Sequence, residues 1–262
     1  MIKKIMALLI LMTGLVLGKE KKELIILSTT STENSGFFSY ILPEFEKDTG
    51  IKTKVIAVGT GKALQMGKDG EGDILIVHDK AKELEFVKEG HGTVRKDLMY
   101  NEFVVLGPKG NFKSLKETLN YISLNNLKFI SRGDNSGTHS KELELWKKYN
   151  IDIINKNWYI SAGNGMGSTI QMANEKLAYT LSDKATYLAM KDKIDLKIVF
   201  EKDVSLYNQY GVILVNPNKN KMINKEGAIK LMDWLLSKKG QNLIGQYGVK
   251  EYKQSLFVPN GK

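Results

Sequence analysis

Apolar runs of strand length alternate with amphipathic helical segments along this chain, and that alternation restricts its fold more than any other feature. Residues 24–27 predict a buried strand, residues 35–48 place their apolar side chains on one helical face, and residues 52–58 predict a second strand. Strands joined by helices in this order are typical of a largely parallel sheet with crossover connections. The chain is therefore predicted to adopt an α/β fold.

Two stronger strand signals indicate that the chain forms two lobes. Residues 99–108 and 210–216 are apolar, end at Pro turns and lie about a hundred residues apart, so they could carry the chain from one lobe to the other and back. We predict lobe 1 from residues 19–101 and 208–262, and lobe 2 from residues 102–207. Helices are predicted over residues 62–68, 82–89, 113–122, 141–149, 168–176 and 226–239, and further strands over residues 74–77, 129–131, 158–161 and 198–200.

Residues 1–18 have the pattern of a signal peptide. Lys3 and Lys4 precede an almost unbroken apolar stretch over residues 5–17, and Gly18 places a small residue before a cleavage point near Lys19. The stretch is too short for a comfortable membrane span, and no later segment is apolar enough to cross a bilayer. Because the chain has no cysteine, neither a lipid anchor nor disulfides are expected. We predict a soluble exported protein without a membrane anchor.

The net charge suggests three classes of partner. It is +10, and falls to +8 when Lys3 and Lys4 are removed, so nucleic acid, an anionic membrane surface or a small anion could be bound. The lysines are spread along the chain, as on an ordinary solvated surface. Tyr and Phe fall largely on apolar faces instead of alternating with lysines, so the pattern does not predict a nucleic-acid partner.

A run of hydroxyl side chains directly follows the first predicted strand: Ser28, Thr29, Thr30, Ser31 and Thr32. Hydroxyl donors between a strand and a helix can hold an anion. A capped strand-to-helix turn would also account for the run. We predict that Thr30 and Ser31 contact an anion, with Thr29 next in rank, and that Ser28 and Thr32 support the turn.

Residues 132–138 form the most specific constellation in the second half of the chain, between a predicted strand and a helix that begins near Thr138. Arg132 offers a guanidinium fork, while Ser136 and Thr138 offer hydroxyls. Gly137 lets backbone N–H groups at the helix start approach a ligand closely. The alternative is plain turn and N-cap chemistry with Arg132 paired to a carboxylate. Coincidence with the hydroxyl run favours an anion clamp.

Two glycine-rich segments also precede predicted helices. Thr60 and Gly61, in the sequence Gly-Thr-Gly-Lys, would bring a hydroxyl and a backbone N–H to the carboxyl edge of the first sheet. This segment lacks the spacing of a dinucleotide fingerprint and the ending of a P-loop, so nucleotide binding is not predicted. Residues 163–169 are interpreted as a tight turn in preference to a ligand contact.

The residues expected of an enzyme are not arranged for catalysis. His78, His91 and His139 are scattered, without a His-Glu-x-x-His pair, and no Gly-x-Ser-x-Gly elbow is present. Each histidine is interpreted as an ordinary satisfied or exposed side chain. We therefore predict a binding protein with no catalytic residue, no metal site and no cofactor.

Several motifs carry a family resemblance. They are Ser-Thr-Thr-Ser-Thr at 28–32 followed by Ser35-Gly36, Leu-Pro-x-Phe-Glu-x-x-Thr-Gly at 42–50, Val-Ile-Ala-Val-Gly-Thr-Gly-x-Ala-Leu at 55–64, Val77-His78, Met-Tyr-Asn-x-Phe-Val at 99–104, Arg-Gly-Asp-x-Ser-Gly-Thr-His at 132–139 and Gly-Met-Gly at 165–167. In this order, and over nearly the whole mature chain, they resemble the tungstate-binding component of bacterial ABC importers.

This resemblance implies a class II periplasmic-binding-protein fold, with two α/β lobes, a two-stranded hinge and an interlobe cleft. The strand pattern places the hinge near residues 100–101 and 208–210. It implies a periplasmic protein that captures tungstate, and molybdate with it, as an oxyanion and passes it to the membrane permease of an ABC importer. We expect a monomer.

The resemblance also assigns site residues. Family members carry a Thr-Thr-Thr-Ser motif, in which Ser28 here replaces the first threonine and keeps its hydroxyl. Arg132 and Thr138 match positions that contribute to ligand binding and selectivity in the family. The predicted ligand-binding residues are Thr29, Thr30, Ser31, Thr60, Gly61, Arg132, Ser136, Gly137 and Thr138.

A phosphate-binding protein of the same fold is the alternative. Tungstate and molybdate are fully ionised at neutral pH and need only donors, whereas phosphate keeps a proton that a carboxylate must accept. Phosphate-binding proteins of this fold carry a similar arginine motif, and Asp134 or Asp73 could supply the carboxylate. Mainly because of the family motif, we rank tungstate before molybdate, and both before phosphate.

Overall fold

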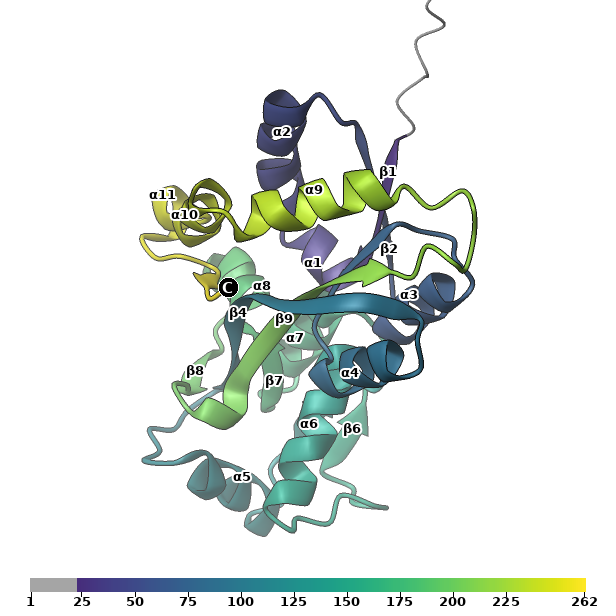
Figure 1. Cartoon of the computed structure of the whole chain (residues 1–262). Coiled ribbons are helices and arrows are strands. Elements are labelled where there is room, and N and C mark those ends of the chain that lie inside the picture. Colours follow the sequence, from purple (N-terminus) through teal and green to yellow (C-terminus); the bar gives the residue numbers. More distant parts are fainter. Residues whose placement is uncertain (1–22) are drawn as a thin grey trace, which may run out of the picture.

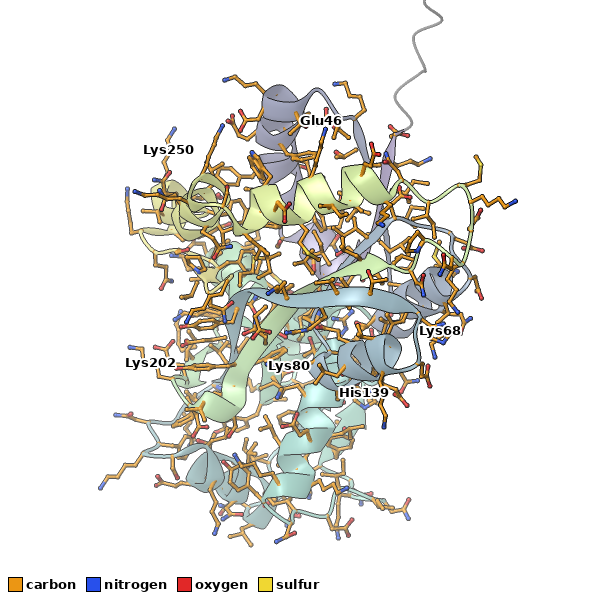
Figure 2. All side chains as sticks on the ribbon, viewed as in Figure 1. Glu46, Lys68, Lys80, His139, Lys202 and Lys250 are labelled. Carbon is orange, nitrogen blue, oxygen red and sulfur yellow. The ribbon has the colours of Figure 1, made fainter. Side chains whose placement is uncertain are left out.

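The computed structural model describes residues 23–262, so the predicted signal peptide, residues 1–18, lies outside the described part of the chain. Within the described part, no helix has the length and apolar character needed to cross a bilayer. Charged side chains are dispersed: Lys68, Lys80, Lys202 and Lys250 lie on separate parts of the molecule (Figure 2).

The N-terminal part of the chain forms the predicted strand–helix–strand unit. Its elements are β1 (Leu24–Thr29), α1 (Thr30–Asn34), α2 (Phe37–Thr49), β2 (Thr53–Val58), α3 (Thr60–Lys68), β3 (Ile74–Val77) and α4 (Lys80–Lys88). Strand β1 pairs in parallel with β2 on one side and β3 on the other. Because the carboxyl ends of parallel strands share one edge, the segments after β1, β2 and β3 lie close together.

Two antiparallel strands, β4 (Gly92–Gly107) and β9 (Tyr207–Val215), run through the middle of the molecule (Figure 1). Their ladder places Asn101 opposite Asn208, and β9 also pairs antiparallel with β3. Beyond this ladder, the end of β4 pairs antiparallel with β7 (Thr180–Asp183) and β8 (Lys197–Phe200). The expectation of a largely parallel sheet is therefore wrong for the strands that pair with β4 and β9, because strands that cross between two groups of elements return in the opposite direction. Residues 129–131 and 159–161 do pair in parallel.

The segment between β4 and β9 builds the second group of elements, at the bottom of Figure 1. In addition to β7 and β8, it contains α5 (Leu115–Leu124), β5 (Phe129–Ser131), α6 (Gly137–Lys148), β6 (Tyr159–Ser161), α7 (Met166–Glu175), α8 (Lys184–Met190) and two short 3₁₀ turns, Lys191–Lys193 and Val204–Leu206. Strand β7 and helix α8 were not predicted. Their sequence signal is weak, because β7 contains only one aliphatic residue; the local cue was Asp183, whose carboxylate accepts from Thr186 N at 2.8 Å and caps α8.

The C-terminal part corrects the single helix predicted over residues 226–239. Helix α9 (Lys225–Leu236) ends at Ser237, whose extended backbone starts a new helix, α10 (Lys238–Gln246). The Ser237 hydroxyl oxygen accepts from Gly240 N at 3.2 Å and caps the start of α10. The apolar pattern continues across Ser237, so it gave no sign of this cap. Helix α11 (Val249–Tyr252) and β10 (Val258–Pro259) follow, and β10 pairs with β4.

Apolar side chains form three clusters around this framework. The first packs α2, α9 and α10 against the sheet and continues to α7 and α8; Phe37 and Phe45 are fully buried in it. The second surrounds Trp146 under α5 and α6, and the third lies between the sheet and helices α3 and α4 around Phe86. The first cluster holds the N-terminal and C-terminal segments against the middle of the chain.

Asp73 closes the amino-terminal edge of the sheet, away from the edge that carries the hydroxyl run. Its side chain is buried and accepts from Ile25 N at 2.7 Å and from Asn224 N at 2.6 Å. Both oxygens therefore hold backbone groups of β1 and of the α9 N-cap. Asp73 is a structural residue and does not face the hydroxyl run.

We expect Asp73→Ala to lower the free energy of unfolding by about 2 to 4 kcal/mol, because two partly buried N–H groups lose a charged acceptor. Asp73→Asn, which keeps one acceptor oxygen, should lose less. Urea denaturation followed by circular dichroism measures both, and equal stability of Asp73→Ala and the unsubstituted protein would contradict this role.

Candidate functional site

Eight of the nine predicted ligand-binding residues line one cavity of about 330 Å³ at the carboxyl edge of the first sheet. They are Thr29, Thr30, Ser31, Thr60, Gly61, Arg132, Ser136 and Gly137. Thr138, the second residue of α6, is 2% exposed and is not among the lining residues. The structure thus brings together segments that follow β1, β2 and β5.

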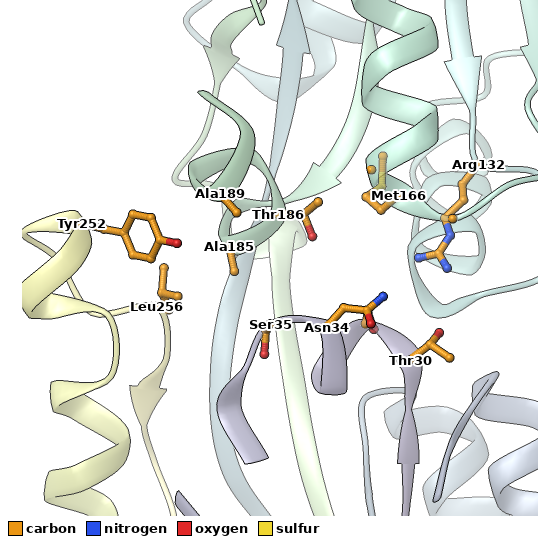
Figure 3. Close-up of a pocket in the computed structure, with 13 residues that line it drawn as sticks. Thr30, Asn34, Ser35, Arg132, Met166, Ala185, Thr186, Ala189, Tyr252 and Leu256 are labelled. Carbon is orange, nitrogen blue, oxygen red and sulfur yellow. The ribbon is translucent and has the colours of Figure 1, made fainter. Parts of the chain in front are cut away.

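A second cavity of about 460 Å³ shares Thr30, Ser31 and Arg132 with the first and extends toward α7, α8 and α11. In Figure 3 the Arg132 guanidinium points across this cavity toward Thr30 and Asn34 of α1. Thr186 of α8 also lines it, although no sequence pattern singled it out.

The glycine-rich segment before α7 lies on the wall of the 460 Å³ cavity. Gly165 and Gly167 line it, although the sequence favours a tight turn over a ligand contact for residues 163–169. A Cβ added at Gly165 would have no atom within 4 Å, so packing against the chain does not explain this glycine. The available signal was a glycine-rich turn directly before a helix, the same signal that selected Gly61.

The hydroxyl run divides into supporting and cavity-facing members. Ser28 is buried and donates to Ile76 O at 2.5 Å, while Thr32 is buried with Oγ1 2.7 Å from Thr29 Oγ1. Thr29 also caps α1 by accepting from Thr32 N. Thr30 is exposed and Ser31 is half-buried, and both line the two cavities. The supporting role predicted for Ser28 and Thr32 agrees with these contacts.

Arg132 is held in a fixed orientation by its neighbours. Its side chain is 8% exposed, and Nε donates to Asp134 Oδ2 at 2.8 Å. Asp134 Oδ1 accepts from Ser136 N at 3.1 Å, so each oxygen of this carboxylate has a donor. The Nη groups of Arg132 have no hydrogen-bond partner within residues 23–262. Arg132 can therefore pair with a carboxylate and still bind an anion. Asp134 uses only Nε of the Arg132 guanidinium, and the two Nη groups stay available for a ligand.

Gly133 is required for this loop to close. Its φ of +64° lies in the left-handed region, and a Cβ there would overlap Ser161 Oγ at 1.8 Å. The loop thereby turns directly after β5 and presents Arg132 to the cavity.

The starts of three helices also face the two cavities. Gly59, Ser136 and Gly165 are the N-cap residues of α3, α6 and α7, and all three line one cavity or the other. The first N–H groups of a helix lack intrahelical partners and carry partial positive charge. Together with the Arg132 guanidinium, these groups create a positive environment suited to an anion.

His78 directly follows β3 and joins the hydroxyl run to the crossing strands. Its Nε2 lies 3.2 Å from Ser31 Oγ, and its Nδ1 lies 3.1 Å from Asn208 Oδ1. Asn208 Nδ2 in turn donates to Asn101 Oδ1 at 2.7 Å. Burial lowers the pKa of His78 from its ordinary value. His78 is thus a satisfied histidine, as interpreted from the sequence, but the sequence did not identify its partners, because they lie 47 and 130 residues away.

The His78 ring also explains Gly137. A Cβ at residue 137 would lie 2.5 Å from His78 Cε1, so any other side chain would displace the imidazole or the start of α6. The two loops, one from each half of the chain, meet at this contact.

The arrangement can bind an anion through donors. Within residues 23–262, no three His, Asp or Glu side chains converge as they would around a metal ion. The cavity walls offer hydroxyls, helix-start N–H groups, the Arg132 guanidinium and the Lys62 side chain. One carboxylate, that of Asp134, also lines the 330 Å³ cavity and is bonded to Arg132 Nε and Ser136 N. Such a shell suits the oxygens of a fully ionised oxyanion.

Comparison with known proteins places the chain in a family. The model of the PBP superfamily domain matches residues 19–239. The tungstate-binding protein TupA of Peptoclostridium acidaminophilum is 54% identical over 248 residues, which cover 92% of this chain and 86% of that protein.

Two solved structures resemble the chain closely. The tungstate-binding protein TupA from Desulfovibrio alaskensis has a TM-score of 0.84 at 40% identity, covering 91% of this chain and 99% of that one. The structure described as the tungstate ABC transporter from Geobacter sulfurreducens has a TM-score of 0.79 at 45% identity, covering 86% and 99%. The fold class and the expectation of a binding protein that is not an enzyme are confirmed by these relatives. The chain therefore belongs to the PBP superfamily and, within it, to the family of tungstate-binding proteins.

Proposed function

We propose that this protein captures tungstate, and molybdate with it, between two lobes and delivers the oxyanion to the membrane permease of an ABC importer. The observation that carries the proposal is the convergence of the hydroxyl run and the Arg132 loop on shared cavities. Relatives of at least 40% identity that are described as tungstate-binding support it. The protein acts as a monomer in the periplasm after removal of residues 1–18.

The proposed ligand shell extends the nine predicted residues. Thr30 and Ser31 donate from α1, Thr60 and Gly61 from the start of α3, and the Arg132 Nη groups from the opposite wall. Gly165 and Gly167 add backbone N–H groups at the start of α7, and Thr138 supports the α6 start from its buried position. This assignment rests on the lining of the two cavities and on the open space beside Gly165.

Closure of the two lobes would complete the shell. Lobe 1 comprises residues 19–101 and 208–262, and lobe 2 comprises residues 102–207. The proposed boundary lies where Asn101 and Asn208 face each other in the β4–β9 ladder. An oxyanion that contacts both lobes favours the closed form, and the permease then distinguishes the loaded protein from the empty one.

The carboxylates disfavour the phosphate alternative. Asp73 holds β1 and α9 at the other edge of the sheet. Asp134 lines the 330 Å³ cavity, and each of its oxygens already accepts one hydrogen bond, from Arg132 Nε and from Ser136 N, so its carboxylate is engaged in orienting the Arg132 loop. Monohydrogen phosphate would need an acceptor for its proton, whereas tungstate needs only donors.

Tungstate should stabilise the folded protein by mass action. At a free concentration one hundred times Kd, the gain is about 2.7 kcal/mol, which raises the melting temperature by about 5 to 10 °C for a chain of this size. Differential scanning fluorimetry and isothermal titration with tungstate, molybdate, sulfate and phosphate measure the order of affinity. Stabilisation by phosphate alone would contradict the proposed function.

Replacement of Arg132 should weaken binding most. We expect Arg132→Ala to raise the Kd for tungstate at least about a hundredfold, because a desolvated charge-assisted pair is lost. Arg132→Lys keeps the positive charge but loses the planar guanidinium, so its Kd for tungstate should lie between those of the unsubstituted protein and Arg132→Ala. Lys202→Ala, at an exposed position, is the control. Retention of the original Kd in Arg132→Ala, measured by isothermal titration, would show that the clamp is misplaced.

A methyl group at residue 165 tests the proposed approach of backbone to ligand. The φ of −62° and the empty space around Gly165 predict that Gly165→Ala folds with unchanged stability. Its methyl group occupies the 460 Å³ cavity, so the Kd for tungstate should rise about tenfold. Gly245→Ala in α10, outside both cavities, should leave the Kd unchanged and raise the free energy of unfolding by up to about 1 kcal/mol, because alanine favours the helix over glycine. An unaltered Kd in Gly165→Ala would remove α7 from the ligand shell.

A further inference from the structure

A chain of hydrogen bonds from Asn101 of β4 to Ser31 of the hydroxyl run determines which nitrogen of His78 carries the hydrogen. Asn208 donates through Nδ2 to Asn101 Oδ1 at 2.7 Å, so its Oδ1 is the atom that faces His78 Nδ1 at 3.1 Å. An amide oxygen can only accept a hydrogen bond. His78 Nδ1 therefore carries a hydrogen, and in the neutral ring Nε2 holds a lone pair.

That lone pair constrains Ser31. His78 Nε2 lies 3.2 Å from Ser31 Oγ, and a neutral Nε2 can only accept there. Ser31 has a single hydroxyl proton, and the buried Nε2 lone pair is satisfied when that proton points at the imidazole. The other neighbour of Ser31 Oγ is Thr29 Oγ1, at 3.2 Å. The hydrogen bonds of this hydroxyl are with Ser31 Oγ and Thr32 Oγ1, so the Ser31 hydroxyl is the group that donates to Nε2. With His78 neutral, Ser31 thus presents oxygen lone pairs to the cavity and would repel an oxyanion.

We propose that His78 is a positioning residue that takes up one proton when an oxyanion binds, which frees the Ser31 hydroxyl to donate to the ligand. The proton comes from solvent and bonds to Nε2. The resulting Nε2–H donates to Ser31 Oγ, and the Ser31 proton turns toward the oxyanion. No covalent bond to the ligand forms. This inference rests on the proposed role of Ser31 as a ligand donor.

The charged groups around His78 support the direction of the change. Asp183 at the start of α8 and Asp79 at the start of α4 raise the pKa of His78, whereas burial and Arg132 lower it. The hydrogen bond with Asn208 also raises the pKa of His78, and the Tyr210 ring of β9 lies beside the imidazole, with 4.8 Å between the ring centres. A dianion bound at Arg132 offsets the guanidinium charge and adds negative potential, so the pKa of His78 rises in the complex.

The coupling has a defined sign. Between the His78 pKa of the free protein and that of the complex, binding consumes one proton, so the Kd for tungstate rises up to about tenfold for each unit of increasing pH. Outside this window the Kd is flat. Tungstate itself is fully ionised near neutral pH, so its own titration does not produce the slope.

The test is isothermal titration of the full mature protein with sodium tungstate in PIPES and in imidazole, which differ in ionisation enthalpy. The difference in apparent heat gives the number of protons taken up, and a pH series gives the slope of log Kd. We expect uptake of up to one proton. His78→Gln keeps an amide beside Ser31 but cannot titrate, so it should bind tungstate with no uptake and a flat pH profile.

His91→Gln is the matched control. His91 lies beside the Phe86 ring and Glu89, outside both cavities, so this variant should retain the proton uptake of the unsubstituted protein. Tungstate binding without proton uptake in the unsubstituted protein, or uptake that persists in His78→Gln, would overturn the inference while leaving the proposed function intact. The absence of tungstate binding would instead overturn the proposed function.

A second measurement does not depend on the variant folding. Nitrogen-15 NMR of the imidazoles distinguishes the Nδ1–H tautomer from imidazolium. We expect the His78 signals to change from the first form to the second on addition of tungstate near neutral pH. A neutral His78 in the saturated complex would overturn the proposal.

Discussion

The antiparallel pairing of β4 with β9 is the constraint on which the rest of the structure depends. Strand β9 carries β3 on its other side, while the far end of β4 carries β7 and β8. The ladder therefore fixes where both halves of the chain present their loops. His78 follows β3 and Asp183 ends β7, so two residues far apart in sequence come near enough for the Asp183 carboxylate to raise the pKa of His78. Backbone hydrogen bonds, which any sequence of suitable pattern can form, thus set the frame of the site.

Several polar groups of the site already form hydrogen bonds within the protein. Thr29 caps α1, Ser136 caps α6, and Asp134 holds Nε of Arg132. These contacts orient the donors before an anion arrives, which reduces the entropy lost on binding. They also leave the Arg132 Nη groups, the Thr30 hydroxyl and the helix-start N–H groups directed toward the cavities. The same local hydrogen bonds therefore decide which donors remain available for an anion and hold those donors in place before it binds.

Local patterns predicted more of the fold than of its connections. The parallel strands β1, β2 and β3 and the helices around them follow apolar periodicity that acts over a few residues, and they agree with expectation. The sequence pattern did not predict the end of α9 at Ser237, nor strand β7 and helix α8. A side-chain cap and a short buried strand add little to the periodicity of apolar residues. The predominance of antiparallel pairs around β4 was also missed, since strand direction is decided by partners distant in the chain.

The amino-acid sequence by itself determined the chemistry: a hydroxyl run after one strand, an arginine loop after another, and glycines that allow backbone to approach a ligand. These features are local, so motif and spacing are enough to find them. Only the tertiary structure decided that Gly165, Gly167 and Thr186 share a cavity with Arg132, and that His78 links Ser31 to Asn208. Those relations join segments up to 130 residues apart in sequence, and no local pattern encodes the distance between two loops that separate strands bring together.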